Sequence, residues 1–129
     1  MFNYNSEVTN VAYQLIMAKD FQKKKLCADR CPFRIVMDRF GDKWSILIIM
    51  TLSENGVMRF NELSTCIDGI SLKVLSSTLK ILEDDEFVCR TVYPEVPPRV
   101  EYRLTQIGLD MVPYIKDISD WAVRNIKSK

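Results

Sequence analysis

Apolar residues recur at helical spacing in the first part of the chain and predict a helix over residues 7–27. The helix is expected to end in the charged run Lys23-Lys24-Lys25. Its apolar stripe comprises Val8, Val11, Ala12, Leu15, Ile16 and Phe21. A stripe of this kind has to be covered. Packing on the same domain and packing on a second subunit both achieve this, and the pattern leaves the two open.

Two more helices are expected before the first strand. Pro32 suits the first turn of a helix that Gly41 terminates. Its expected inward-facing residues are Phe33, Val36, Met37 and Phe40. Asp42 is expected to cap the second helix, which covers Lys43–Ser53. Its expected core residues are Trp44, Leu47, Ile48 and Leu52.

A short strand and a short helix follow. Asn55-Gly56 is a turn signal, after which Val57–Phe60 is predicted to form the strand. Asn61 is expected to cap the helix, which covers Glu62–Ile67. Asp68-Gly69 is expected to form the next turn.

The following segment predicts a longer helix with two different faces. Ser71 is expected to cap it, and it runs to about Asp85. One face carries Leu72, Leu75, Leu79 and Leu82. The other face carries Lys73, Ser76, Ser77, Lys80 and Asp84. The apolar side is expected to pack in the core, which leaves the small and charged side chains in solvent.

Residues 87–105 predict a β-hairpin. Residues 87–93 and 99–105 are rich in β-branched and aromatic side chains, and in the second segment apolar and charged positions alternate. The connection contains Pro94, Pro97 and Pro98, which fix φ and lack amide donors, so the loop is stiff. Arg99 lies where the loop enters the second strand. Thr105 is then expected to cap a C-terminal helix over Gln106–Ile126, with Pro113 as an internal break or kink.

These elements follow the order α-α-α-β-α-α-β-β-α, an α+β arrangement that is mostly helical. A short helix, a tight turn and a second helix form a helix-turn-helix, whose second helix enters the DNA major groove. A stiff hairpin beside it forms the wing. We therefore expect a winged helix-turn-helix that binds double-stranded DNA. The expected DNA-binding residues are Arg59, Asn61, Ser71, Lys73, Ser76, Ser77, Lys80, Pro98 and Arg99.

Composition narrows the functional classes. With 129 residues the chain is the size of one ordinary domain, and 47% hydrophobic with 27% charged residues is typical of a globular protein. No apolar run approaches the length of a membrane span and no secretory signal is apparent, so a cytoplasmic protein without membrane contact is expected. The net charge of +1 gives no general attraction for DNA, so positive charge has to be local and doubled by dimerisation.

Catalysis and metal binding are disfavoured. The sequence has no histidine and no G-x-S-x-G, P-loop or G-x-G-x-x-G motif, so neither an enzyme nor a cofactor site is predicted. Zinc binding at Cys27 and Cys31 would need two further, distant ligands, and no metal is expected. Cys66 and Cys89 are expected to be buried packing residues.

Several segments together resemble the HxlR-type branch of the MarR-like winged-helix regulators. They are CPFRIVMDRFGDKWSILII, MRFNEL, DGIS and VYPEVPPRVEYRLTQIG, and the similarity covers roughly Cys31–Trp121. The resemblance implies a homodimer joined through its N- and C-terminal helices and bound to pseudo-palindromic DNA. It divides the chain into a dimerisation extension, residues 1–30, and a winged domain, residues 31–129. The family has glycine near the end of the recognition helix where this chain has Asp84-Asp85-Glu86, so a left-handed residue there costs about 1 kcal/mol.

The resemblance also implies that Cys31 senses oxidants or electrophiles. The residue precedes a helix and lies near Arg30 and Arg34, and both features favour the thiolate. Simple packing of Cys31 is the equal alternative. For the whole chain, two other functions stay open: a protein–protein interaction module on a winged scaffold, and a thiol-dependent redox enzyme, which the lack of a C-x-x-C motif disfavours.

Overall fold

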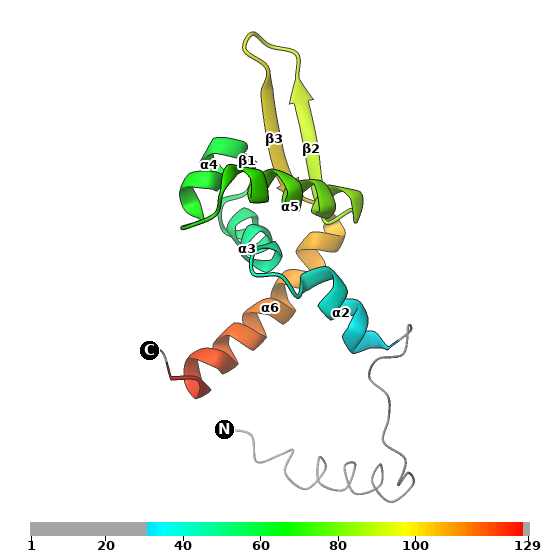
Figure 1. Ribbon diagram of the computed structural model, residues 1–129, viewed down its shortest axis with the longest axis vertical. Helices are drawn as coiled ribbons and strands as arrows, with labels where there is room; N and C mark the ends of the chain where they lie inside the picture. The colour runs from blue at the N-terminus through cyan, green and yellow to red at the C-terminus, as the bar shows by residue number, and fades with distance from the viewer. Residues whose placement is uncertain (1–30, 128–129) are drawn as a thin grey trace, which may run out of the picture. The chain divides into compact units, whose positions relative to one another are not determined.

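The computed structural model describes residues 31–127. The helix predicted over residues 7–27 and the extension 1–30 lie outside this range. The described elements are α2 (Pro32–Phe40), α3 (Ser45–Asn55), β1 (Met58–Arg59), α4 (Phe60–Cys66), α5 (Leu72–Asp84), β2 (Val88–Tyr93), β3 (Arg99–Leu104) and α6 (Gln106–Asn125). They follow the predicted order from α2 onward (Figure 1).

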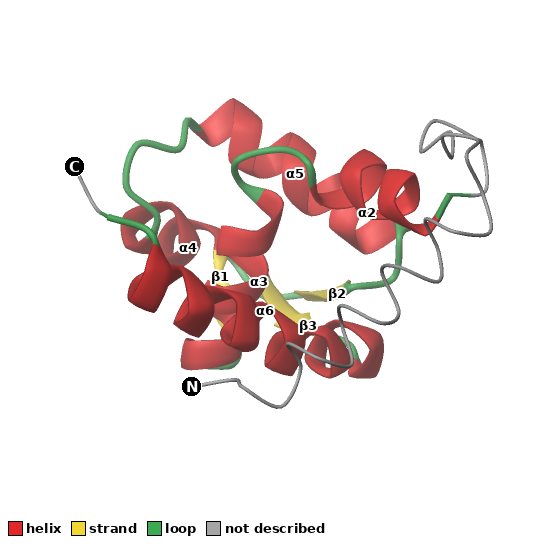
Figure 2. Cartoon of the chain, turned by 90° about the horizontal axis from the view of Figure 1, so that it is seen from below, coloured by secondary structure: helices red, strands yellow, loops and turns green. Residues whose placement is uncertain are grey.

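The residues from Arg39 onward form one unit, and α2 spans its start. Within this unit the three strands form an antiparallel sheet in the order β1-β3-β2. Tyr102 in β3 pairs with Met58 in β1 and with Arg90 in β2. Helices make up most of the described chain, and the strands are short (Figure 2). The fold is therefore α+β and mostly helical, as predicted.

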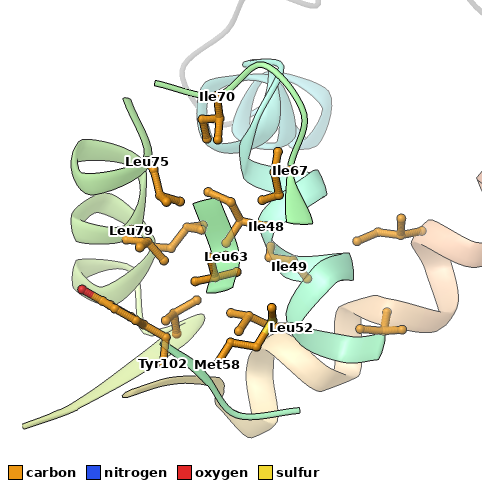
Figure 3. Packing of buried hydrophobic residues seen from close by; sticks show 14 residues of the cluster. Ile48, Ile49, Leu52, Met58, Leu63, Ile67, Ile70, Leu75, Leu79 and Tyr102 are labelled. Carbon is orange, nitrogen blue, oxygen red and sulfur yellow. The ribbon is translucent and has the colours of Figure 1, made fainter. Parts of the chain in front are cut away.

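The core collects side chains from every element between α3 and α6. Ile48 and Ile49 of α3 meet Leu63 of α4, and Leu75 and Leu79 of α5 close one side (Figure 3). Met58, Leu52 and Tyr102 lie at the sheet. The core thus fixes α4 and α5 relative to the hairpin, which determines the surface that the two helices present.

Ser71 and Thr105 cap α5 and α6 as predicted, whereas α3 begins at Ser45, two residues later than predicted, so that Trp44 is its N-cap and Asp42 lies two residues before the N-cap. The Asp42 carboxylate accepts hydrogen bonds from the amides of Trp44 (2.9 Å) and Ser45 (2.8 Å) and from the Ser45 hydroxyl (2.6 Å). The Ser71 hydroxyl accepts from the Val74 amide at 3.1 Å, and Thr105 caps α6 in the same way. Each of these side chains satisfies amides that the helix itself cannot pair.

Asn61 does not cap α4, contrary to the prediction. The helix begins earlier, at Phe60, so Asn61 lies inside it. Instead, the Glu62 carboxylate reaches back and accepts from the Arg59 amide at 3.1 Å. This hydrogen bond satisfies the amide of the N-cap residue Arg59, a different donor from the first-turn amides that Asn61 was expected to pair.

Several burial predictions are wrong. Phe33, Val36 and Met37 of α2 are exposed, and the unit that holds the core cluster begins only after them, at Arg39. Leu47 is exposed and Ile49 takes its place, since α3 is apolar on nearly every side and the sequence does not reveal its inner face. Two further residues that were expected to be buried are exposed. They are Leu72, at the first position of α5, and Cys66, the last residue of α4. Cys89 is half-buried.

The course of α6 at Pro113 and the end of α5 differ from a regular helix in what the sequence predicts. α6 continues through Pro113, so of the expected break or kink the break is absent. α5 ends at Asp84, and Glu86 takes φ of 67°, in the left-handed region that glycine adopts most readily. The Phe87 amide donates to the Leu82 carbonyl at 2.9 Å, which completes the turn that follows α5.

Candidate nucleic-acid interface

Helices α4 and α5 form the helix-turn-helix. Residues 67–71 connect them, and Ile67 and Ile70 of this connection are buried. Leu63 of α4 and Leu75 of α5 belong to the same core cluster, which holds the two helices together. One side of α5 remains in solvent, and the hairpin of β2 and β3 extends beyond it (Figure 1).

The solvent side of α5 carries four of the predicted DNA-binding residues, namely Lys73, Ser76, Ser77 and Lys80. All are exposed, and their spacing of three, one and three residues places them on one side of the helix. The Ser77 hydroxyl donates to the Val74 carbonyl at 3.1 Å. Ser71 lies at the helix start, where its hydroxyl is used in capping. The face combines short polar side chains with two flexible cations.

Lys80 is held loosely. Its Nζ lies 2.8 Å from Asp84 Oδ1, and both side chains are largely exposed. The hydrogen bond from Lys80 to Asp84 raises the pKa of Lys80, and nearby Arg90 acts in the opposite direction. An exposed ion pair of this kind adds little stability, so the lysine can exchange Asp84 for another anion.

Arg59 and Asn61 lie together at the start of α4. Arg59 ends β1, opposite Glu101 of β3, and Asn61 is the second residue of α4. Both side chains are exposed. The structure thus brings this predicted pair to the entrance of the helix-turn-helix.

Arg99 is more constrained than the sequence suggests. Its guanidinium lies 3.2 Å from Glu101 and 3.5 Å from Glu95, and 4.1 Å above the Tyr93 ring. Direct partners in an antiparallel ladder share a face, and Arg99 pairs with Tyr93. Arg99 therefore belongs to the hairpin face opposite buried Val88 and Tyr102, whereas Pro98 is exposed in the loop.

Sequence reasoning missed Arg90. It pairs with Tyr102 and shares a strand face with Val88, both of which are buried. Arg90 is exposed all the same, and with Lys80 it lines a pocket beside α5. The signal was available in the strand register, because Arg90 interrupts an otherwise apolar row formed by Val88 and Val92.

Cys31 immediately precedes α2. Its side chain is half-buried, and its carbonyl accepts from the Ile35 amide at 3.1 Å. Across residues 31–127, no group of three or more potential ligands is placed to hold a metal ion. Over the same residues, no helix combines the length and hydropathy needed to traverse a bilayer.

The helix-turn-helix and its hairpin define the class of winged-helix transcriptional regulators, and the comparisons agree. Residues 39–129 match the model of the HxlR-like helix-turn-helix family, to which the chain belongs. The HTH-type transcriptional regulator YtfH of Escherichia coli K12 is 36% identical over 113 residues, covering 88% of this chain and 89% of YtfH. The members of this family are transcriptional regulators and not enzymes.

Solved structures show the same fold. A protein of Porphyromonas gingivalis W83 assigned to the MarR family of regulators is 38% identical, with a TM-score of 0.71. The match covers 80% of this chain and all of that protein. The redox regulator HypR in its oxidised form is 35% identical, with a TM-score of 0.66, covering 76% of this chain and all of HypR. This chain is accordingly a transcriptional regulator with a helix-turn-helix DNA-binding domain.

Proposed function

We propose that the protein binds pseudo-palindromic operator DNA as a homodimer, with one α5 helix in each of two major grooves. Successive major grooves on one side of B-DNA lie about 34 Å apart, so the two helices have to be held at that separation. The observation that carries the proposal is the composition of the exposed face of α5. Two lysines and two serines project there, flanked by exposed Leu72 and Ile81, and the centre of a protein-binding surface would instead favour aromatic and apolar anchors.

The contacts divide into those that read bases and those that hold the backbone. Ser76 and Ser77 are short enough to approach base edges, and Lys73 and Lys80 reach guanine or phosphate. Ser71 lies at the end of α5 nearest the bases. Arg59 and Asn61 hold a phosphate at the start of α4, and Pro98 and Arg99 form the wing contact. Because Arg99 is bound to two carboxylates, it reaches a phosphate by exchanging one of them.

The dimer is supported by an apolar seam along α6. Ile107, Met111, Tyr114, Ile118 and Trp121 follow a spacing of four, three, four and three residues, as in a coiled-coil seam. Tyr114 and Ile118 are 71% and 68% exposed, a large apolar surface for a helix of a monomer. A second copy supplies the same seam, and the N-terminal extension adds to the contact.

Regulation is proposed at Cys31. HypR, which is similar to this chain in sequence and fold, is a redox regulator. In this chain Cys31 lies at the start of a helix. A peroxide converts a cysteine thiolate to a sulfenic acid and releases water or hydroxide, and an electrophile such as a quinone alkylates it. Either change adds bulk at the start of α2, and we propose that this alters the angle between the two DNA-binding domains.

DNA binding is tested with the duplex that flanks the protein's own gene. Footprinting of a dimer is expected to show two protected patches about one helical turn apart. Lys73→Gln is expected to weaken binding, and Lys116→Gln on α6 is the control, since Lys116 is also exposed, lies outside the proposed DNA-binding face and forms an ion pair with Glu54. Wild-type protein with fully reduced cysteines that prefers no duplex over random competitor would refute the proposal.

A further inference from the structure

A polar pocket lies between the recognition helix and the wing. Its volume is about 310 Å³, and it is lined by Ser76, Leu79, Lys80, Glu83, Arg90 and Tyr102. These residues come from α5, β2 and β3, which the core holds in fixed positions. Ser76 and Lys80 belong to the exposed face of α5, so the pocket opens at the edge of the proposed DNA-binding surface.

Arg90 is placed for an external partner. Its strand face leads from buried Val88 toward the hairpin loop, so Arg90 emerges just beyond the core, on the side where α5 packs against β2. Arg39 and Arg99 each contact a carboxylate within 3.5 Å. Among the ion pairs of residues 31–127, none involves Arg90.

A second cation converges on the same space. Lys80 and Arg90 line the same pocket; the hydrogen bond to Asp84 raises the pKa of Lys80, the charge of Glu83 also raises it, and the charge of Arg90 has a smaller, lowering effect. Two cations that approach each other beside a pocket favour an anion between them. The hydroxyls of Ser76 and Tyr102 add donors, and the phenolic oxygen of Tyr102 points out of the core toward α5 (Figure 3).

We propose that this pocket binds one phosphate of the DNA backbone, with Arg90 and Lys80 as its cations. The inference rests on the proposed DNA binding and adds Arg90 and Tyr102 to the interface. Glu83 also lines the pocket, and its carboxylate repels a free phosphate dianion more strongly than a singly charged phosphodiester. The phosphodiester replaces Asp84 as the partner of Lys80, and the contact fixes the hairpin and α5 in one register on the duplex.

The experiment measures DNA affinity over a series of salt concentrations. Arg90→Gln is expected to weaken binding about tenfold for every duplex sequence and to reduce the salt slope by about one for each arginine removed. Arg90→Lys keeps the charge and is expected to retain most of the slope. Arg103→Gln is the matched control, because Arg103 is exposed on the opposite face of the same hairpin, paired with Cys89. It is expected to leave affinity and slope nearly unchanged.

Failure of this inference can be separated from failure of the proposed function. If wild-type protein binds its operator and Arg90→Gln binds as tightly as Arg103→Gln, the phosphate site is refuted while DNA binding stands. Lys80→Gln gives an independent second variant, and thermal unfolding of each variant confirms that it is folded. Inorganic phosphate is titrated into DNA-free protein at constant ionic strength as a further arm. Saturable binding that Arg90→Gln abolishes, with DNA affinity unchanged, would assign the pocket to a free anion and overturn the proposal.

Discussion

Glu86 adopts a backbone conformation that costs free energy for any residue other than glycine. Its φ of 67° is the conformation that glycine adopts without penalty, and the hydrogen bond from the Phe87 amide to the Leu82 carbonyl requires the chain to turn there. Glu86→Gly is therefore expected to stabilise the protein by about 1 kcal/mol and to raise the unfolding midpoint by about 3 °C. Thermal unfolding followed by circular dichroism measures the change.

Glu86→Ala is the control for this prediction. Alanine removes the charge from the acidic run but keeps the cost of positive φ, so its gain is expected to be small. Equal stabilisation by alanine and glycine would show that repulsion between acidic side chains, and not backbone conformation, is responsible.

Asp42 couples the start of α3 to pH. Partial burial raises the pKa of Asp42, but hydrogen bonds from the Ser45 hydroxyl and from the amides of Ser45 and Trp44 outweigh it, and the pKa is lowered from 3.8. The unfolded chain therefore binds a proton more readily than the folded one. The contribution of the cap to stability is present above about pH 4 and is lost as pH falls through the lowered pKa.

Asp42→Asn tests this contribution, because asparagine also caps helices but does not titrate. Urea unfolding of both proteins at about pH 6 and about pH 3 is expected to show a smaller loss on acidification for the variant. An identical loss in the two proteins would contradict the role of Asp42. Asp42→Ala is expected to cost about 1 kcal/mol at the higher pH.

Single residues also show which features of the structure could be predicted from the sequence. Asp42, Ser71 and Thr105 were predicted as caps because a short polar side chain before an apolar run is a local signal. Asn61 carries the same signal, but Glu62 competes for the role and the helix begins before it. Arg90 interrupts the apolar row of Val88 and Val92, which is visible in the sequence, but that this strand face meets α5 is a tertiary property.

At the scale of elements, amphipathic segments were predicted better than uniformly apolar ones. α5 separates its faces clearly, and only Leu72 at its first turn was misplaced. α3 has apolar residues on nearly every side, so its inner face is determined by the helices and strands around it. The burial of α2 was mispredicted for a similar reason, since an apolar stripe along a helix does not specify which surface will pack against it.

The α6 seam gives a prediction about assembly. Ile118→Asp places a charge in the middle of the apolar seam and is expected to shift the protein toward monomers and to weaken operator binding at least tenfold, since both half-sites then bind separately. Val123→Asp is the control, because Val123 is 83% exposed and lies on the opposite side of α6 from the seam. Sedimentation velocity measures both. A dimer that survives Ile118→Asp would place the interface elsewhere.

At the scale of the whole molecule, a net charge of +1 is compatible with DNA binding only if charge is arranged locally. The described part of the chain shows such an arrangement: Lys73 and Lys80 lie on the exposed side of α5, and Arg90 lies beside them. Asp85 is directed to Arg39, 3.4 Å away, and Asp84 to Lys80. The ion pair with Arg39 partly neutralises Asp85, which lessens its repulsion of a duplex, whereas Asp84 loses its partner when Lys80 binds a phosphate.

In the proposed mechanism, regulation is a property of the whole dimer, because a change at Cys31 would affect DNA binding through the placement of the two domains. Cys31→Ser is expected to leave the affinity of reduced protein for its operator unchanged and to abolish the loss or gain of binding caused by peroxide or quinone. Cys66→Ser is the informative control, since Cys66 is exposed and lies in α4 of the helix-turn-helix itself. If general thiol exposure determined the response, Cys66→Ser would remove it. A response that persists in Cys31→Ser and disappears in Cys66→Ser would transfer the sensing role to α4, where modification acts on DNA binding without any rearrangement of the dimer.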